Sequence, residues 1–141
     1  MVGFTEYSAS VSPNTLVNFM NFMFLRFDKI VARHGVYKVE IIGDAYFCVG
    51  GCPEPYSDHA NRIAEVAFAF LEQIPNLQQY AKQLQSGQGK REPQNISVRI
   101  GVHSGPVMAG VVGIRDPRYH LFGNTVIRAE TLESKQPMPQ F

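Results

Sequence analysis

The segment from Val36 to Val49 constrains the fold more than any other part of the sequence. Val36 to Ile42 alternates between apolar and polar positions and is rich in β-branched residues, which is typical of a strand. Ala45 to Val49 follows the same pattern, and Gly43-Asp44 between the two runs is a tight-turn pair. These residues predict an antiparallel hairpin with an aspartate at its tip.

Helical patterns lie on both sides of this hairpin. Ser12-Pro13 predicts the start of a helix, with Ser12 as the N-cap and Pro13 in the first helical position. The apolar run that follows covers more than one helical face and ends at His34-Gly35, so we expect a helix buried on several sides. A second helix is expected to begin at Ser57, with Pro75 near its end.

The remaining chain predicts further strands and one more helix. The expected elements are a strand over Ile96–His103, a strand over Val107–Val112, a loop over Gly113–His120, a short strand at Leu121-Phe122 and a helix over Thr125–Ser134. This order predicts an α+β fold with a mostly antiparallel sheet and helices on one side. The polar loop Ser86–Gln94 marks no domain boundary, so residues 1–141 are expected to form a single domain.

Charge and cysteine content exclude several classes of function. The net charge is +1 and no basic cluster is interleaved with aromatics, so nucleic acid is not an expected partner. Cys48 and Cys52 are expected to be reduced thiols, which favours a cytoplasmic setting. The apolar stretch Leu16–Val31 contains three charged residues and is shorter than a membrane span of about 20 residues. Any membrane attachment is therefore expected only through a larger parent protein.

Two short features can bind a nucleotide, although each also has a plain structural explanation. A carboxylate such as Asp44 on a rigid turn is well placed to hold a divalent cation for phosphoryl or nucleotidyl transfer. Gly-Asp is equally a common hairpin turn. The glycine turn Gly3-Phe4-Thr5 can cradle phosphate with its backbone N–H groups or can be an ordinary strand exit.

Five segments taken together in order closely resemble the class III adenylyl/guanylyl cyclase catalytic domain. They are Val2–Thr5, Tyr37–Tyr46, Arg99–Gly105, Ala109–Gly113 and Pro117–Val126. The similarity extends from Val2 to about Ser134. It implies a ferredoxin-like cyclase domain without its last strands, and it puts the first of the family's two metal-binding aspartates just upstream of Met1.

The resemblance implies roles for residues that contact the triphosphate. Asp44 matches the second metal-binding aspartate, which implies Mg²⁺ or Mn²⁺ as cofactor. Gly3, Phe4 and Thr5 match the turn whose backbone amides hold the phosphates.

The resemblance also implies which residues recognise the base. Glu40 matches the position that is glutamate in guanylyl cyclases and lysine in adenylyl cyclases, and a carboxylate can accept from guanine N1–H and its 2-amino group. Arg118 matches a basic residue beside the base pocket, and can equally be a loop arginine. The second base position, cysteine in guanylyl and aspartate in adenylyl cyclases, is His120 here. Imidazole can donate to guanine O6, so GTP is favoured as substrate and ATP remains the alternative.

Two positions in the last helix depart from the family. The family places there an asparagine that orients the ribose and, four residues later, an arginine that stabilises phosphate charge in the transition state. The aligned residues are Ile127 and Thr131, which offer neither that hydrogen bond nor that charge. Arg128 lies about 100° further around the helix. Losing one such stabiliser costs on the order of 10² or more in rate.

Family members pair head-to-tail and form active sites at the interface between the two domains. We therefore expect a guanylyl cyclase-type domain that works with a second cyclase domain, as homodimer or heterodimer, and has little activity alone. The alternatives are an adenylyl cyclase, a catalytically dead regulatory or dimerisation module, and a shortened piece of an ordinary cyclase.

Overall fold

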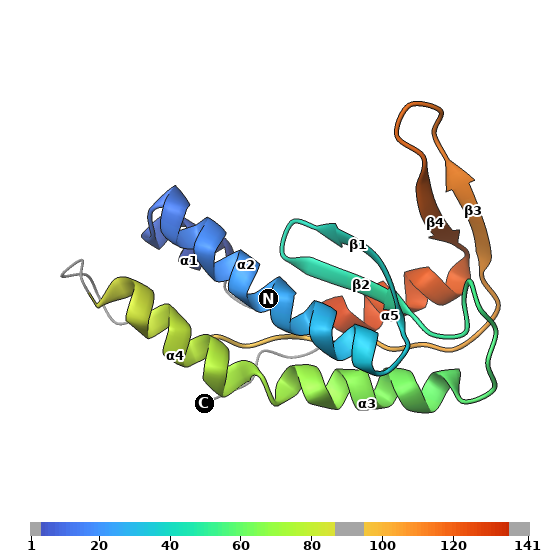
Figure 1. Cartoon of the computed structure of the whole chain (residues 1–141), viewed down its shortest axis with the longest axis horizontal. Coiled ribbons are helices and arrows are strands. Elements are labelled where there is room, and N and C mark those ends of the chain that lie inside the picture. The colour runs from blue at the N-terminus through green and yellow to red at the C-terminus, as the bar shows by residue number, and fades with distance from the viewer. Residues whose placement is uncertain (1–3, 87–94, 136–141) are drawn as a thin grey trace.

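The computed structural model describes residues 4–86 and 95–135. These residues form the helices α1 (Phe4–Ser10), α2 (Pro13–Arg33), α3 (His59–Leu71), α4 (Ile74–Gln85) and α5 (Asn124–Ser134), and the strands β1 (Tyr37–Ile42), β2 (Ala45–Val49), β3 (Met108–Val112) and β4 (Arg118–Phe122) (Figure 1). None of these helices is both long and apolar enough to cross a membrane.

The first long helix begins and ends where the sequence predicts. The hydroxyl of Ser12 accepts from the backbone N–H of Thr15 at 3.2 Å, and Pro13 is the first helical residue of α2. Gly35 follows the helix with φ +63, a left-handed conformation that glycine adopts without steric cost. The chain then turns directly into β1.

The single helix expected from Ser57 is in fact two helices. α3 has Asp58 rather than Ser57 as its N-cap residue, and the carboxylate of Asp58 accepts from Nε of Arg62 at 2.9 Å. Pro75 lies in the first turn of α4, not near the end of a helix. A proline needs no hydrogen-bond partner in a first turn, so it begins a helix as readily as it follows one.

The strands form two separate antiparallel hairpins rather than one sheet. β1 pairs with β2, with Tyr37 opposite Val49 and an irregularity between Lys38 and Glu40. β3 pairs with β4, with Val112 opposite Arg118, so β4 begins inside the segment expected to be a loop. Antiparallel pairing is confirmed, and the continuous sheet is not observed within the described residues.

The strand expected over Ile96–His103 is also wrong. Within the described part of that segment only Ser97 forms an isolated bridge. The segment is held by α5 instead: Arg99 Nε donates to Glu133 Oε1 at 2.8 Å, and a Cβ atom at Gly101 would collide with the Ala129 carbonyl. A strand requires a neighbouring strand for its ladder, and here a helix occupies that neighbouring position.

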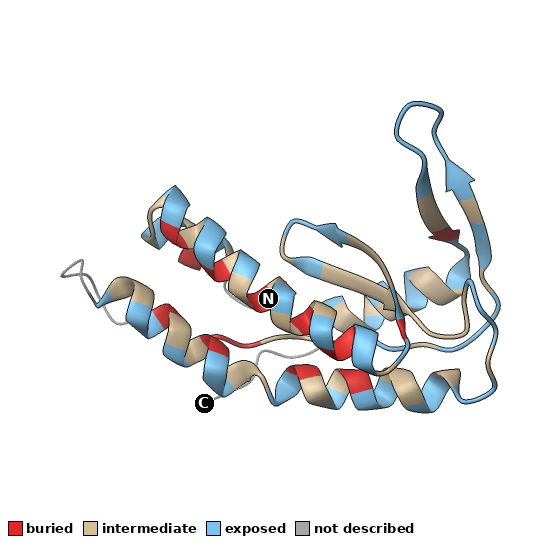
Figure 2. Cartoon of the chain, in the orientation of Figure 1, coloured by how far each residue is buried: buried red, intermediate tan, exposed pale blue. Residues whose placement is uncertain are grey.

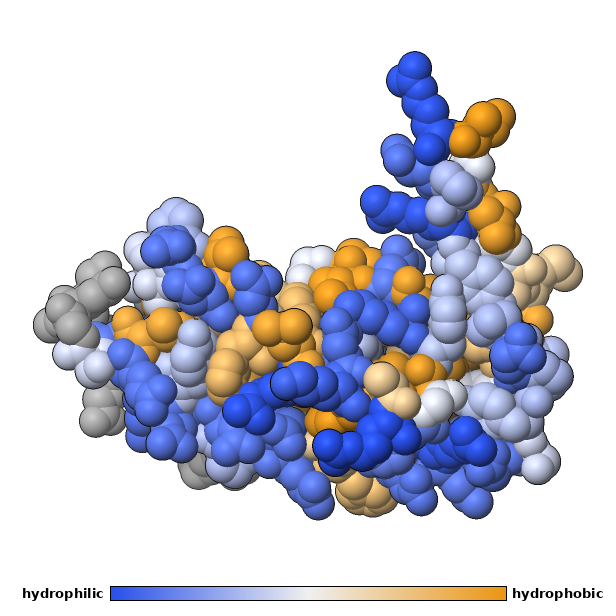
Figure 3. Space-filling view, viewed as in Figure 1, coloured by the Kyte–Doolittle hydropathy of each residue, from blue (hydrophilic) through white to orange (hydrophobic). Residues whose placement is uncertain are grey.

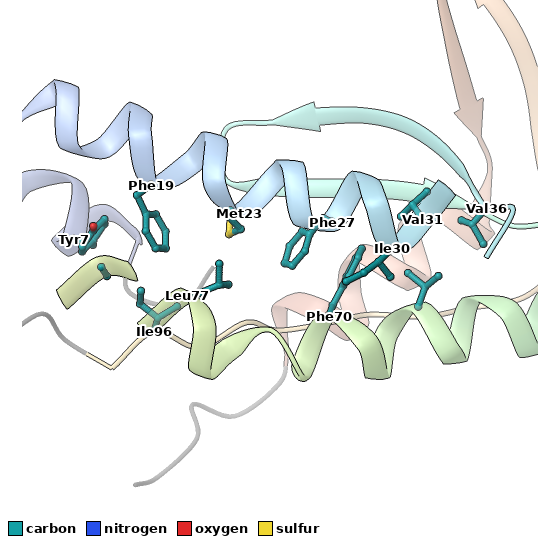
Figure 4. Packing of buried hydrophobic residues seen from close by; sticks show 12 residues of the cluster. Tyr7, Phe19, Met23, Phe27, Ile30, Val31, Val36, Phe70, Leu77 and Ile96 are labelled. Carbon is teal, nitrogen blue, oxygen red and sulfur yellow. The ribbon is translucent and has the colours of Figure 1, made fainter. Parts of the chain in front are cut away.

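The hydrophobic core lies between α2 and the pair α3 and α4. Buried residues follow the lower face of α2 in Figure 2, and Figure 4 shows them meeting side chains of α3 and α4. Phe19 is 0% exposed and Met23 is also fully buried, whereas Val17 and Leu25 on the same helix are exposed. The helix is therefore buried on one broad face and open to solvent on the other.

Candidate functional site

The structure brings two of the predicted base-reading residues together. Glu40 lies in β1 and His120 in β4, and His120 Nδ1 is 3.7 Å from Glu40 Oε1. Both side chains are partly buried, and the register irregularity of β1 lies immediately before Glu40. Such irregularities re-aim side chains. The two hairpins thus meet at a carboxylate and an imidazole, a pair that can accept and donate hydrogen bonds side by side.

The third predicted base-reading residue, Arg118, lies on the same strand as His120. Residues two apart on a strand share a face. Arg118 is exposed at the start of β4, opposite Val112. Its guanidinium is therefore available to a ligand that approaches the Glu40–His120 pair from solvent.

Tyr119 faces away from His120 and ties β4 to the body of the molecule. Its hydroxyl lies 2.7 Å from the sulfur of Cys52, and its ring meets the ring of Tyr37 edge-on at 5.3 Å. The hydrogen bond with Cys52 and partial desolvation raise the pKa of Tyr119 to about 12, which keeps the hydroxyl protonated. Sequence reasoning missed this contact, since neither residue carries a local signal for it.

The candidate metal ligand Asp44 lies at the tip of the β1–β2 hairpin, as expected. Gly43 before it has φ +60, which suits a tight turn. Asp44 is partly buried and lines a cavity of about 560 Å³. Figure 1 shows this turn at the end of the hairpin away from β3–β4. In residues 4–86 and 95–135, no group of three His, Cys, Asp or Glu side chains is arranged to hold a metal.

The predicted phosphate turn takes a different form. Phe4 and Thr5 open α1, and the Thr5 carbonyl accepts from the Ser8 hydroxyl at 2.9 Å. The segment is therefore helical from Phe4 onward, not a turn. Gly3 lies outside the described residues.

Ile127 and Thr131 lie one turn apart on α5. The Thr131 hydroxyl donates to the Ile127 carbonyl at 2.7 Å, so it is bonded within its own helix. Ile127 is 58% exposed. These positions present an apolar surface with no charge toward solvent.

The cavity next to Asp44 is mostly apolar. Side chains from α2, α3, β2 and α5 line it, together with the segment 98–107. Cys48 is among them, and burial raises the pKa of its thiol to about 12.

Thiol labelling is expected to separate the two cysteines. Because the thiolate is the reactive species, Cys48 should react with a maleimide at pH 8 at least about tenfold more slowly than Cys52. The measurement compares Cys52→Ser, which leaves Cys48, with Cys48→Ser, which leaves Cys52. Both variants should react at similar rates in denaturant. Equal rates in the folded state would contradict the burial of Cys48.

The β3–β4 hairpin exposes apolar side chains. Figure 1 shows it projecting from the rest of the molecule, and Figure 3 shows apolar residues along one of its flanks and hydrophilic ones along the other. The exposed apolar residues are Met108, Val111, Val112, Ile114 and Phe122. We call this set the hairpin patch. Apolar patches on a projecting element mark interaction surfaces.

The sequence pattern of the adenylate and guanylate cyclase catalytic domain matches residues 1–140. The chain belongs to this family. Members of the family are nucleotide cyclases, so the class of chemistry predicted from the sequence is confirmed at the level of the family.

Known cyclases are similar over nearly the whole chain. Guanylate cyclase soluble subunit beta-2 of Rattus norvegicus is 44% identical over 134 residues, which are 95% of this chain and 18% of the rat subunit. The chain thus spans less than a fifth of that relative.

Solved cyclase domains have the same fold. The guanylate cyclase domain of RhGC from Catenaria anguillulae, in complex with GTP, is 38% identical with a TM-score of 0.77, and the match covers 95% of this chain and 68% of that one. A dimeric guanylyl cyclase domain of the RhoGC fusion protein from Blastocladiella emersonii is 37% identical with a TM-score of 0.78 and the same coverages. The predicted α+β, ferredoxin-like cyclase fold is confirmed.

Proposed function

We propose that this chain is a guanylate cyclase-type domain that converts GTP to cyclic GMP and pyrophosphate as one half of a dimer. The observation that carries the proposal is the 3.7 Å approach of His120 to Glu40 across two hairpins. Both residues occupy base-reading positions of the cyclase family. The GTP complex of the similar RhGC domain supports the choice of nucleotide.

Glu40 and His120 form the base-recognition pair in this proposal. The Glu40 carboxylate accepts from N1–H and the 2-amino group of guanine, and the His120 imidazole donates to O6. Adenine has no matching donor pair for Glu40, which makes ATP the weaker substrate. Arg118, exposed on the same face as His120, binds at the edge of the base pocket.

Asp44 is the metal ligand that the chain contributes. Its carboxylate suits Mg²⁺ or Mn²⁺, since such ions bind through one or two carboxylates and complete their shells with water and phosphate oxygens. The bound ion would stabilise negative charge on the phosphates as the ribose 3′-hydroxyl attacks. Phe4 and Thr5 lie in the first turn of α1 rather than in a glycine turn, and their backbone N–H groups are the ones proposed to bind the phosphates.

The partner domain supplies what this chain lacks. Ile127 has no polar side-chain group that could orient a ribose. The Thr131 hydroxyl donates to a carbonyl of its own helix and carries no charge that could neutralise a phosphate. In the site that contains Asp44, a second cyclase domain supplies the base-reading residues together with the family's asparagine and arginine. Glu40 and His120 read the base in the other site of the dimer. The hairpin patch is the surface through which the two domains meet, and the dimeric RhoGC domain supports pairing. In a membrane-bound parent, the domain lies on the cytoplasmic side.

The test is a cyclase assay with Mn²⁺ and either GTP or ATP. The chain is assayed alone and after mixing with a cyclase domain that carries the asparagine and arginine. We expect product only in the mixture, at the site that contains Asp44. This product should disappear in Asp44→Ala and persist in Asp116→Ala, which removes an exposed loop aspartate. The preference for GTP over ATP that Glu40 and His120 confer is measured in the reverse mixture, in which this chain carries Ile127→Asn and Thr131→Arg and the second domain supplies both metal-binding aspartates.

A second candidate function is a catalytically inactive module that binds a partner cyclase domain and regulates it. The intrahelical hydrogen bond of Thr131 and the exposed Ile127 favour it, because α5 then presents an apolar face. If this chain forms a complex with the second cyclase domain but the mixture makes no product from either GTP or ATP, this candidate is supported and the proposed catalytic role is overturned.

A further inference from the structure

We propose that Cys52 and Tyr119 form a latch that positions Arg118 and His120 for base recognition. The inference rests on the proposed function of Glu40 and His120 as the base-recognition pair. Cys52 and Tyr119 touch neither substrate nor metal in this proposal, so they are positioning residues. The ligand they influence is the purine base of a nucleoside triphosphate.

The latch joins two segments that are far apart in sequence. Cys52 lies three residues after β2, and Tyr119 is the second residue of β4. Their sulfur and oxygen atoms are 2.7 Å apart. Tyr37, the first residue of β1, packs edge-on against the Tyr119 ring at 5.3 Å. One tyrosine therefore contacts both ends of the β1–β2 hairpin, near its base.

The β3–β4 hairpin depends on such a contact for its orientation. It projects from the molecule (Figure 1) and pairs with no third strand within the described residues. A lone two-stranded hairpin is marginally stable in water. Besides the approach of His120 to Glu40 and the buried side chain of Leu121, the hairpin is linked to the body at its base, where the Thr125 hydroxyl donates to the Pro106 carbonyl at 2.8 Å. A link at the base leaves the angle of the hairpin free, whereas the Tyr119 contact holds its side.

The latch acts on base recognition through the adjacent residue. Tyr119 and His120 project from opposite faces of β4, so fixing Tyr119 on the Cys52 side fixes how far His120 reaches toward Glu40. The Nδ1 to Oε1 separation of 3.7 Å is close to the limit of direct interaction, so a small rotation of β4 would open it. Misplacing a recognition group by about 1 Å can cost on the order of 10² in rate.

The experiment uses three variants and one control. Tyr119→Phe removes the hydroxyl and keeps the ring, and Cys52→Ala removes the sulfur. Cys52→Ser restores a hydrogen-bonding group at the same atom. Tyr56→Phe is the matched control, because the Tyr56 hydroxyl donates to the Gly35 carbonyl at 3.2 Å and not to a residue of β4.

Two measurements are made on these proteins. In the first, amide hydrogen exchange over residues 108–122 should accelerate about fivefold in Tyr119→Phe and Cys52→Ala, as expected for loss of one hydrogen bond. Cys52→Ser and Tyr56→Phe should match the unmodified chain. In the second, each variant also carries Ile127→Asn and Thr131→Arg and is mixed with a cyclase domain that keeps both metal-binding aspartates but lacks its own asparagine and arginine, so that the productive site is the one read by Glu40 and His120. The ratio of kcat/KM for GTP to kcat/KM for ATP should fall at least about fivefold in Tyr119→Phe and Cys52→Ala, mainly through KM for GTP.

The two measurements separate the latch from the proposed function. Unchanged exchange in Tyr119→Phe would overturn the latch. Faster exchange with an unchanged GTP to ATP ratio would overturn its role in base recognition. If the mixture makes no product with a chain that carries only Ile127→Asn and Thr131→Arg, the proposed base-recognition function fails. The positioning role then fails with it, even where exchange shows that the contact holds the hairpin.

Discussion

A chain carrying Ile127→Asn and Thr131→Arg is expected to gain on the order of 10² or more in cyclase activity in a directed mixture. The second component is a cyclase domain that keeps both metal-binding aspartates and has lost its own asparagine and arginine. The site assembled from that domain's metal ligands then lacks only the groups that α5 of this chain can supply. Positions 127 and 131 lie one turn apart on α5, so both new side chains project from the same face.

The substitutions should not disturb folding. Ile127 is exposed, and the Thr131 hydroxyl bonds only within its own helix as far as the structure records it. Ile127→Asn with Leu132→Arg is the matched control, because position 132 lies about 100° away from position 131 around the helix. A double variant that folds normally and remains inactive, like this control, would refute the assignment of these positions.

Phe27→Ala is expected to lower the free energy of unfolding by about 3–5 kcal/mol. Phe27 is 4% exposed and stacks on Phe70 with ring centroids 4.0 Å apart. The Tyr46 ring meets Phe27 edge-on at 5.7 Å. Truncation therefore removes contacts between α2, α3 and β2 at once and leaves a cavity where three elements meet. Urea denaturation followed by circular dichroism measures the loss.

Phe68→Ala is the matched control for this measurement. Phe68 lies two residues before Phe70 on α3 and is 68% exposed. Its removal should change the free energy of unfolding by less than about 0.5 kcal/mol, as for most surface substitutions. If Phe27→Ala fails to fold, Phe27→Leu should still show a smaller loss. Equal effects of Phe27→Ala and Phe68→Ala would contradict the position of the core.

Features that depend on a few neighbouring residues could be predicted from the sequence. Ser12-Pro13 marks the start of α2, and Gly43-Asp44 marks the turn between β1 and β2, because capping and turn geometry are decided locally. The division between α3 and α4 was not predicted, because Pro75 is compatible with both the end and the start of a helix. Ile96–His103 has the pattern of a strand, but pattern alone does not provide the neighbour that a strand needs.

The candidate site shows the same difference between local and long-range information. The position of Asp44 at a hairpin tip could be predicted from the local strand-turn-strand pattern. The approach of His120 to Glu40 required the two hairpins to be placed relative to each other. Family resemblance linked these two residues by their roles, but not by a distance. The contact between Cys52 and Tyr119 joins residues 67 positions apart, and no local sequence pattern around either residue predicts it.

The two sides of the β1–β2 hairpin have different consequences for the protein in concentrated solution. β1 carries Lys38 and Glu40, whose charges discourage another chain from pairing with it. β2 reads Ala-Tyr-Phe-Cys-Val, with no charge and no proline, and among the described residues 4–86 and 95–135 it pairs only with β1. Uncharged, aromatic and β-branched segments of this kind promote amyloid-like stacking when their backbone is accessible. The edge of β2 that does not pair with β1 therefore favours aggregation. A partner that covers this edge would also prevent intermolecular strand pairing.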